Sequence, residues 1–141
     1  WDQQIALNLR PHFIAAKACA EVMKPGSSII GISSIASLRA AVRFAGYGAA
    51  KAGMNNLSQT LAIELAPKGI RSNIVSPGQV PTEATTRVGG VPPEKFSDLA
   101  AAIPLQRVGS PQDIAAAVLY LVSEAGSWVT GQNLIVDGGY T

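Results

Sequence analysis

Short apolar runs alternate with long amphipathic segments along this chain, and this alternation limits the fold more than any other feature of the sequence. The apolar runs have little polar alternation, which is typical of strands buried on both faces of a parallel sheet. The segments between them have the three- and four-residue apolar spacing of helices. We therefore predict an α/β fold, part of a doubly wound sheet with helices on both faces. The expected strands are 28–33, 71–76 and 133–137, and the expected long helices are 1–23, 47–65 and 111–122.

Pro11 interrupts the first of these helices. A proline has no N–H with which to bond the carbonyl of Leu7, so we predict a kink or bulge beside Asn8 and Arg10. On the same segment Cys19 stands among alanines, and we predict that it is a small core residue.

Proline is concentrated in the region between the second strand and the last helix. Six of the nine prolines lie between positions 77 and 111, which favours a long ordered loop with a short helix. Ser110 followed by Pro111 is a helix start, with the serine as N-cap and the proline at the first helical position.

The composition excludes several classes of protein. Hydrophobic residues make up 48% and charged residues 14%, so disorder from high charge is excluded. Eleven basic and nine acidic residues give a net charge of +2 without runs of one sign, which argues against nucleic acid or an anionic membrane as partner. No transmembrane segment is expected, and a single cysteine suits a reducing cytoplasm.

Three polar side chains are expected to meet at one edge of the predicted sheet. Tyr47 and Lys51 are four apart, so they share one helix face about one turn from each other. Ser34 ends the preceding strand, and ligands bind at the carboxyl ends of strands in open parallel sheets. A nearby ammonium stabilises a phenolate, so Lys51 would make Tyr47 a usable general acid/base. The spacing alone also fits an amphipathic tyrosine beside a solvated lysine.

Six motifs stand in order along the chain. They are Asn-Leu in the first helix (Asn8), a strand ending in Ser-Ser (Ser34), Tyr-x-x-x-Lys (47–51), Gly-Ile-Arg-x-Asn (69–73), Pro-Gly-x-x-x-Thr (77–82) and Thr-Gly-Gln-x-x-x-Val-Asp-Gly-Gly (130–139). With these motifs the chain resembles the short-chain dehydrogenases/reductases over essentially its whole length.

The resemblance implies an oxidoreductase that moves a hydride between NAD or NADP and a secondary alcohol or ketone. Tyr47 would exchange a proton with the substrate oxygen, which Ser34 would hydrogen-bond. Lys51 would assist the tyrosine and hold the nicotinamide ribose, and Asn8 would support a water that relays protons to Lys51. The residues implied in cofactor binding are Tyr47, Lys51, Pro77, Gly78, Val80 and Thr82.

The sequence also allows other roles for some of these residues and for nearby charged residues. Asn8 would otherwise be a kink amide that bonds backbone, and Thr82 a loop cap. His12 is predicted to be a surface or interface residue rather than a metal ligand, because no second ligand is spaced to help it. The arginines at 39, 43 and 87 are predicted to be solvated loop charges.

The resemblance covers only the C-terminal catalytic portion of the family. No G-x-G-x-x-G turn occurs in the 141 residues, and the chain starts at Trp1. We expect a single partial domain, 1–141, of a Rossmann-like fold, with 79–108 as the substrate loop. The choice between NAD and NADP and the identity of the substrate are left open.

Two functions of different class follow from these observations. The first is the oxidoreductase, whose partners would be a small alcohol or carbonyl substrate and further copies of the chain. A homodimer or homotetramer would form through the two long helices. The second is a truncated, non-catalytic chain that pairs those helices with another subunit.

Overall fold

A computed structural model describes residues 1–83, 85–86, 92 and 94–141 of the chain. Its described part contains one parallel sheet of β1 (Ser28–Ile32), β2 (Arg71–Pro77) and β3 (Asn133–Val136), in the order β1-β2-β3. Gly31 of β1 pairs with Ile74 of β2, and Ile74 pairs with Asn133 of β3. The α/β fold and the three parallel strands predicted from the sequence are therefore confirmed.

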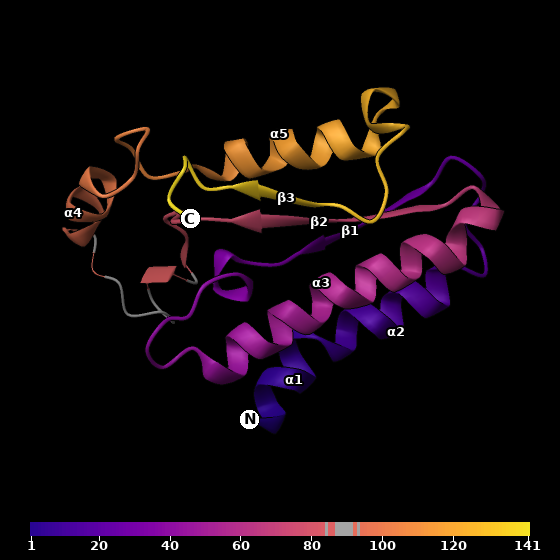
Figure 1. Ribbon diagram of the computed structural model, residues 1–141, viewed down its shortest axis with the longest axis horizontal. Coiled ribbons are helices and arrows are strands. Elements are labelled where there is room, and N and C mark those ends of the chain that lie inside the picture. The colour runs from indigo at the N-terminus through magenta and orange to yellow at the C-terminus, as the bar shows by residue number, and fades with distance from the viewer. Residues whose placement is uncertain (84, 87–91, 93) are drawn as a thin grey trace.

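Helices cover both faces of this sheet (Figure 1). α1 (Asp2–Asn8), α2 (Arg10–Cys19) and α3 (Ala45–Leu65) lie on one face, and α5 (Pro111–Val122) lies on the other. The short α4 (Lys95–Ala101) lies beyond the carboxyl ends of the strands. Single 3-10 turns, η1 (Ile35–Ser37), η2 (Ala66–Lys68) and η4 (Glu124–Gly126), follow β1, α3 and α5. No helix among the described residues is long and apolar enough to cross a membrane.

The first predicted helix is broken where Pro11 required it. Leu9 separates α1 from α2 with φ −120° and ψ −53°, and the N–H of His12 donates to the Leu9 carbonyl at 3.2 Å. The prediction for Cys19 is wrong, because its side chain is exposed. Neighbouring helix residues point about 100° apart, so burial of Ala16 and Ala20 turns Cys19 away from the core.

The main core lies between the α2–α3 pair and the sheet. Gly53 of α3 lets the junction between α1 and α2 pack closely against it, since a Cβ there would meet Leu9 Cδ2 at 3.0 Å. β1 is not buried on both faces as predicted, since Ile32 is 44% exposed. The reason is that β1 is an edge strand of this sheet. The central cluster consists of Ala16, Ala20, Leu61, Leu65 and Ile70.

Buried polar groups join β2 to the segment before β3. Asn73, which is fully buried, donates to the Val129 carbonyl at 2.8 Å and accepts the Gln132 N–H at 3.0 Å. Arg71 donates to the carbonyls of Leu121 and Val129 at 2.7 and 3.0 Å. Buried polar groups need such partners, so the Gly-Ile-Arg-x-Asn motif has a structural role here.

A capping box fixes the start of α5, as the Ser-Pro pair predicted. The Ser110 hydroxyl accepts the Asp113 N–H at 3.2 Å, and the Asp113 carboxylate accepts the Ser110 N–H at 2.7 Å. Arg107 binds the same carboxylate through two nitrogens at 2.8 and 2.9 Å. The hydrogen bonds from Arg107, followed by those from Ser110, hold the pKa of Asp113 well below its usual range.

Candidate active site

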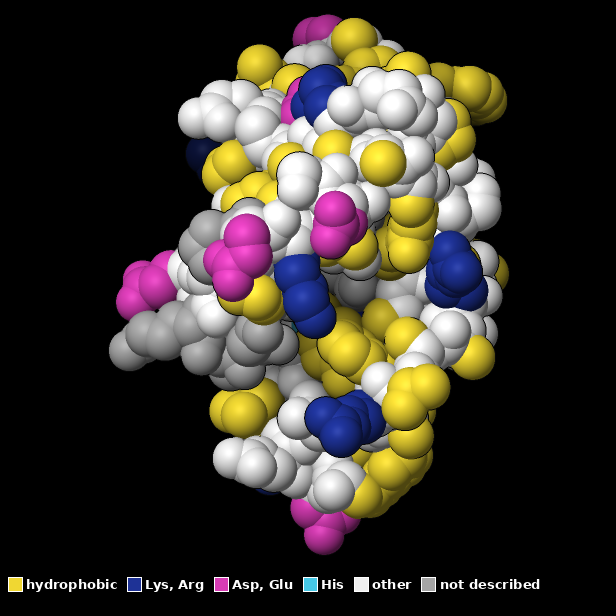
Figure 2. Space-filling model, turned by 90° about the vertical axis from the view of Figure 1, so that its left-hand side faces the viewer, with side chains coloured by type: hydrophobic (Ala, Val, Ile, Leu, Met, Phe, Trp, Pro, Cys, Tyr) yellow, Lys and Arg dark blue, Asp and Glu magenta, His cyan; other side chains and the backbone are white. Residues whose placement is uncertain are grey.

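Ser34, Tyr47 and Lys51 lie at the carboxyl end of β1, the left-hand end of the sheet in Figure 1, whereas the Asn8 side chain bonds Gln4 of its own helix. The Ser33 N–H donates to the Val75 carbonyl at 2.8 Å, so the two strands end side by side. Ser34 follows β1, and Gly78 follows β2. Figure 2 faces this end of the molecule and shows a hollow with hydrophobic side chains inside it and basic side chains around it.

Lys51 is held at the end of β1 from both its side chain and its backbone. Its Nζ donates to the Ile32 carbonyl at 2.8 Å, and its own carbonyl accepts the Ser33 hydroxyl at 3.2 Å. The side chain is half-buried, and this burial lowers the pKa of Lys51 below its ordinary value. An ammonium has three donor hydrogens, and Ile32 uses one of them.

Tyr47 lies beside this ammonium on the same face of α3. The Lys51 Nζ is 5.6 Å from the centroid of the Tyr47 ring, and Phe44 packs edge-on against that ring with the centroids 5.7 Å apart. The four-residue spacing therefore places the two side chains together as the sequence predicted. Phe44 therefore restricts the Tyr47 ring from one side, and the Tyr-x-x-x-Lys motif did not indicate this contact.

Ser34 is carried by the turn that joins β1 to η1. Its hydroxyl accepts the Ala36 N–H at 3.1 Å and so caps this turn. A Cβ at Gly48 would lie 2.8 Å from the Ala36 carbonyl oxygen, so glycine lets the turn pack against the first part of α3, which carries Tyr47. Within the described residues, no hydrogen bond joins Ser34 Oγ, Tyr47 Oη and Lys51 Nζ to one another.

Asn8 is the last residue of α1, directly before the break. Its side-chain Nδ2 donates to the side-chain oxygen and to the carbonyl of Gln4, at 2.9 and 3.2 Å. The amide is therefore engaged within its own helix, as expected of a kink amide. The relay of protons through a water to Lys51 stays a prediction.

The segment after β2 is held by hydrogen bonds to β3 and by hydrogen bonds within its own turn. A Cβ at Gly78 would lie 2.6 Å from Asp137 Cβ, so only glycine fits there, and the Gly78 N–H donates to Val136 at 2.9 Å. The Thr82 hydroxyl accepts the Thr85 N–H at 3.2 Å, which is the loop-cap arrangement. Val80 is buried. Within the predicted substrate loop 79–108, positions 84, 87–91 and 93, and hence Arg87, lie outside the described residues.

His12, predicted to be a surface or interface residue, is half-buried. Its ring lies against the buried Gly31, where a Cβ would be 3.0 Å from His12 Cε1 and 3.3 Å from Nε2. Burial, followed by the positive charge of Lys51, lowers the pKa of His12 below its ordinary value.

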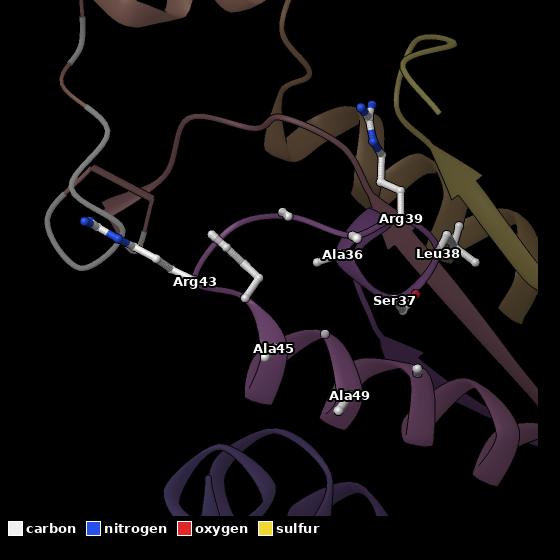
Figure 3. A pocket seen from close by; sticks show the side chains of 12 residues that line it. Ala36, Ser37, Leu38, Arg39, Arg43, Ala45 and Ala49 are labelled. Carbon is white, nitrogen blue, oxygen red and sulfur yellow. The ribbon is translucent and has the colours of Figure 1, made fainter.

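Two loop arginines line a hollow of about 430 Å³ between the β1–α3 loop and the start of α3 (Figure 3). No predicted catalytic or cofactor-binding residue lines it, although Phe44, which packs against Tyr47, does. Arg39 is not simply solvated: it donates to the Tyr140 carbonyl at 3.2 Å and stacks on the Tyr140 ring. Arg43 has a left-handed backbone with φ 70°.

Metal chemistry has no support in the described part of the chain. No group of three or more His, Cys, Asp or Glu side chains is placed to hold a metal ion there. The donors at the sheet edge are instead an ammonium and hydroxyls, which suit an organic ligand.

Comparison with known proteins identifies the family. A family model described as Enoyl-(Acyl carrier protein) reductase matches residues 1–141. A solved structure from Brucella melitensis, titled a short-chain dehydrogenase/reductase and glucose/ribitol dehydrogenase, covers 100% of this chain with a TM-score of 0.92 and 36% identity. The chain belongs to the short-chain dehydrogenase/reductase family.

Other members of the short-chain dehydrogenase/reductase family agree over the same region. The peroxisomal 2,4-dienoyl-CoA reductase of Saccharomyces cerevisiae is 44% identical over 96% of this chain and 46% of its own length. The structure of a 4-hydroxyisoleucine dehydrogenase complexed with NADH has a TM-score of 0.88 and 32% identity, and matches 97% of this chain and 57% of that one. The chain spans about half the length of the curated relatives it matches. It corresponds to the C-terminal portion of the family's fold.

Proposed function

We propose that this protein is an NAD- or NADP-dependent oxidoreductase that acts on a secondary alcohol or ketone. The observation that carries the proposal is the fixed Lys51 ammonium, 2.8 Å from the Ile32 carbonyl and 5.6 Å from the Tyr47 ring, at the edge of the sheet where ligands bind. Tyr47 would be the acid/base and Ser34 the hydrogen-bond donor to the substrate oxygen.

Each of these side chains has a distinct task in the proposed reaction. When bound, the nicotinamide supplies or accepts the hydride. Tyr47 Oη gives its proton to the carbonyl oxygen during reduction and takes it back during oxidation. The Lys51 charge favours the phenolate form of the tyrosine, and the Ser34 hydroxyl orients the substrate oxygen. Asn8 would support the water that returns protons to Lys51.

The residues at the sheet edge suit the nicotinamide end of the cofactor. Lys51 keeps two donor hydrogens beyond the one used by Ile32, and these would hold ribose hydroxyls. Tyr47, Pro77, Gly78, Val80 and Thr82 would complete this contact surface, with Thr82 released from its bond to Thr85. The pyrophosphate needs a glycine-rich turn at a helix N-terminus, which these 141 residues do not contain. The proposed activity belongs to the protein in a form that also supplies that turn.

The substrate class rests on the family and on the loop 79–108. Relatives carry names as different as 2,4-dienoyl-CoA reductase and glucose/ribitol dehydrogenase, so the names alone do not select a substrate for this chain. We infer a small alcohol or carbonyl compound, with 79–108 as the region that selects it.

Replacing the phenol of Tyr47 tests the proposed acid/base. Tyr47→Phe is expected to lower kcat by roughly 10² to 10⁴, because general acid/base catalysis is lost, while the dissociation constant of NADH or NADPH changes little. The assay follows cofactor oxidation with a panel of ketones, on the longest form of the protein that is expressed. Tyr120→Phe is the matched control, since Tyr120 lies exposed on α5. Retention of kcat within about threefold in Tyr47→Phe would exclude this role.

A non-catalytic role in subunit pairing is the second candidate. It is favoured by large apolar side chains that are exposed on the helix layer, among them Phe13 at 48%, Ile14 at 50% and Ile63 at 76%. Such a chain would bind another subunit, most simply a second copy, through α2 and α3. Cofactor titration separates this candidate from the oxidoreductase.

A further inference from the structure

The histidine of α2 and the lysine of α3 converge on the last two residues of β1. His12 is pressed against Gly31, with Cε1 and Nε2 3.0 and 3.3 Å from the position of a Cβ. Lys51 Nζ is 2.8 Å from the carbonyl oxygen of the next residue, Ile32. A Cβ at position 31 would also lie 2.5 Å from Ile74 Cδ1. Glycine at this position therefore lets the imidazole lie against β1, one residue before the carbonyl that binds Lys51.

The buried nitrogen of this ring has no protein partner. His12 Nε2 is inaccessible to solvent and, within the described residues, makes no hydrogen bond. Buried polar atoms without a partner are rare and call for an explanation. The proposed reaction gives His12 no task, so the ring is a buried titratable group that the catalytic residues leave unexplained.

The charges around His12 have one sign. From α3 it faces Lys51, whose charge acts on it. Gly31 of β1 and Ile74 of β2 bring no charge to it. On its own helix Arg10 and Lys17 are exposed, and so is Asp2, the acidic residue of α1. Within the described residues, no carboxylate balances a positive charge on the imidazole.

We propose that His12 is a positioning residue for Lys51: neutral, it lets the ammonium stay on the Ile32 carbonyl, and protonated, it repels the ammonium from that place. As the pH falls the ring takes a proton from solvent, and two positive charges then meet at the end of β1. The catalytic consequence rests on the proposed function, in which Lys51 must stay beside Tyr47. Loss of activity on the acid side of the pH profile would then originate in His12.

Titration of the histidine ring by NMR tests this coupling without any assay of activity. The chain has one histidine, so its ring signals are unambiguous. The midpoint in the wild-type protein is expected below the ordinary value for histidine, and Lys51→Met should raise it. Lys51→Arg keeps the charge and should keep the low midpoint. Lys17→Met, which removes an exposed lysine of α2, is the matched control and should leave the midpoint unchanged.

Two outcomes would overturn the proposal. One is an equal midpoint in wild type and Lys51→Met, once circular dichroism has shown both to be folded. The other is a midpoint in Lys51→Arg that rises to the value of an unfolded chain, which remains decisive if Lys51→Met fails to fold.

The pH profile of kcat/KM tests the catalytic consequence. In His12→Gln the ratio of kcat/KM at high pH to that at a pH one unit below the histidine midpoint found by NMR should be smaller than in wild type by about threefold or more, because glutamine takes no proton. An unchanged ratio would refute the link to catalysis. If the protein shows no activity at any pH, the proposed function fails, and the NMR titration still decides whether His12 and Lys51 are coupled.

Discussion

At the scale of the residue, His12 and Lys51 show how burial changes the chemistry of single side chains. Each lies half-buried near the end of β1, and burial is the main cause of the lowered pKa of each. The burial of the Lys51 charge is compensated by its hydrogen bond to the Ile32 carbonyl. The histidine avoids an uncompensated charge by staying neutral to lower pH than a solvated imidazole.

This lowered pKa predicts how the stability of the chain depends on pH. The pKa of His12 is lower in the folded state than its ordinary 6.5 in the unfolded chain, so below about pH 6.5 the unfolded chain binds more protons. The free energy of unfolding should therefore fall as the pH drops through that range. In His12→Gln this part of the pH dependence should disappear.

Urea denaturation of both proteins between about pH 8 and pH 5.5 measures the effect. The wild-type protein should lose more stability across this range than His12→Gln. If His12→Gln loses as much unfolding free energy as the wild type, His12 has the same pKa in the folded and unfolded states, and the prediction is wrong.

At the scale of the element, the start of α5 is fixed by its own first turn. The Ser110 hydroxyl and the Asp113 carboxylate accept backbone N–H groups there, and Arg107 donates to the same carboxylate and so fastens the preceding loop to the helix. The Pro111 ring adds a backbone angle already suited to a helix. The residue before the cap, Gly109, is also held from a distance, since its N–H donates to the Gln79 carbonyl at 2.8 Å.

Removing the cap should destabilise the chain by a modest amount. Ser110→Ala is expected to lower the free energy of unfolding by about 1 kcal/mol, because the Asp113 N–H loses its acceptor. Chemical denaturation gives this value. The matched control is Gln112→Ala, at an exposed position in the same turn, which should change stability by less than about 0.5 kcal/mol. Equal effects of the two substitutions would contradict the capping role.

At the scale of the whole molecule, this chain carries the strand ends that suit a nicotinamide but no turn for a pyrophosphate. Large side chains are also exposed, with Trp1 at 73%, Val22 at 79% and Trp128 at 99%. Exposed apolar surface of this kind favours association with another chain.

The 141-residue chain by itself should bind NADH and NADPH weakly and self-associate. A few neutral hydrogen bonds from Val80 and Thr82 are worth about 1 kcal/mol each, so the dissociation constant should be weaker than about 1 mM, or ~4 kcal/mol of binding. Isothermal titration and light scattering on one sample measure both properties. Micromolar binding by a monomer would refute this prediction and the subunit-pairing candidate together.

The sequence by itself determined the features that depend on neighbours within one element. Helical spacing, the Ser-Pro start of α5 and the break at Pro11 are local, so each was predicted and found. Tyr47 and Lys51 meet because four residues make about one helical turn. The family motifs are also local in the sequence. They mark the ends of strands and helices in order, and this order indicated the fold class.

Only the tertiary structure decided which surfaces these elements turn toward one another. Cys19 is exposed because Ala16 and Ala20 pack inward, and Ile32 is exposed because β1 is an edge strand. His12 lies against β1, near the strand end that binds Lys51, because Gly31 leaves space for its ring. Contacts of this kind join residues that are far apart in the sequence. Their geometry is set by the packing of whole elements, which no local pattern of residues records.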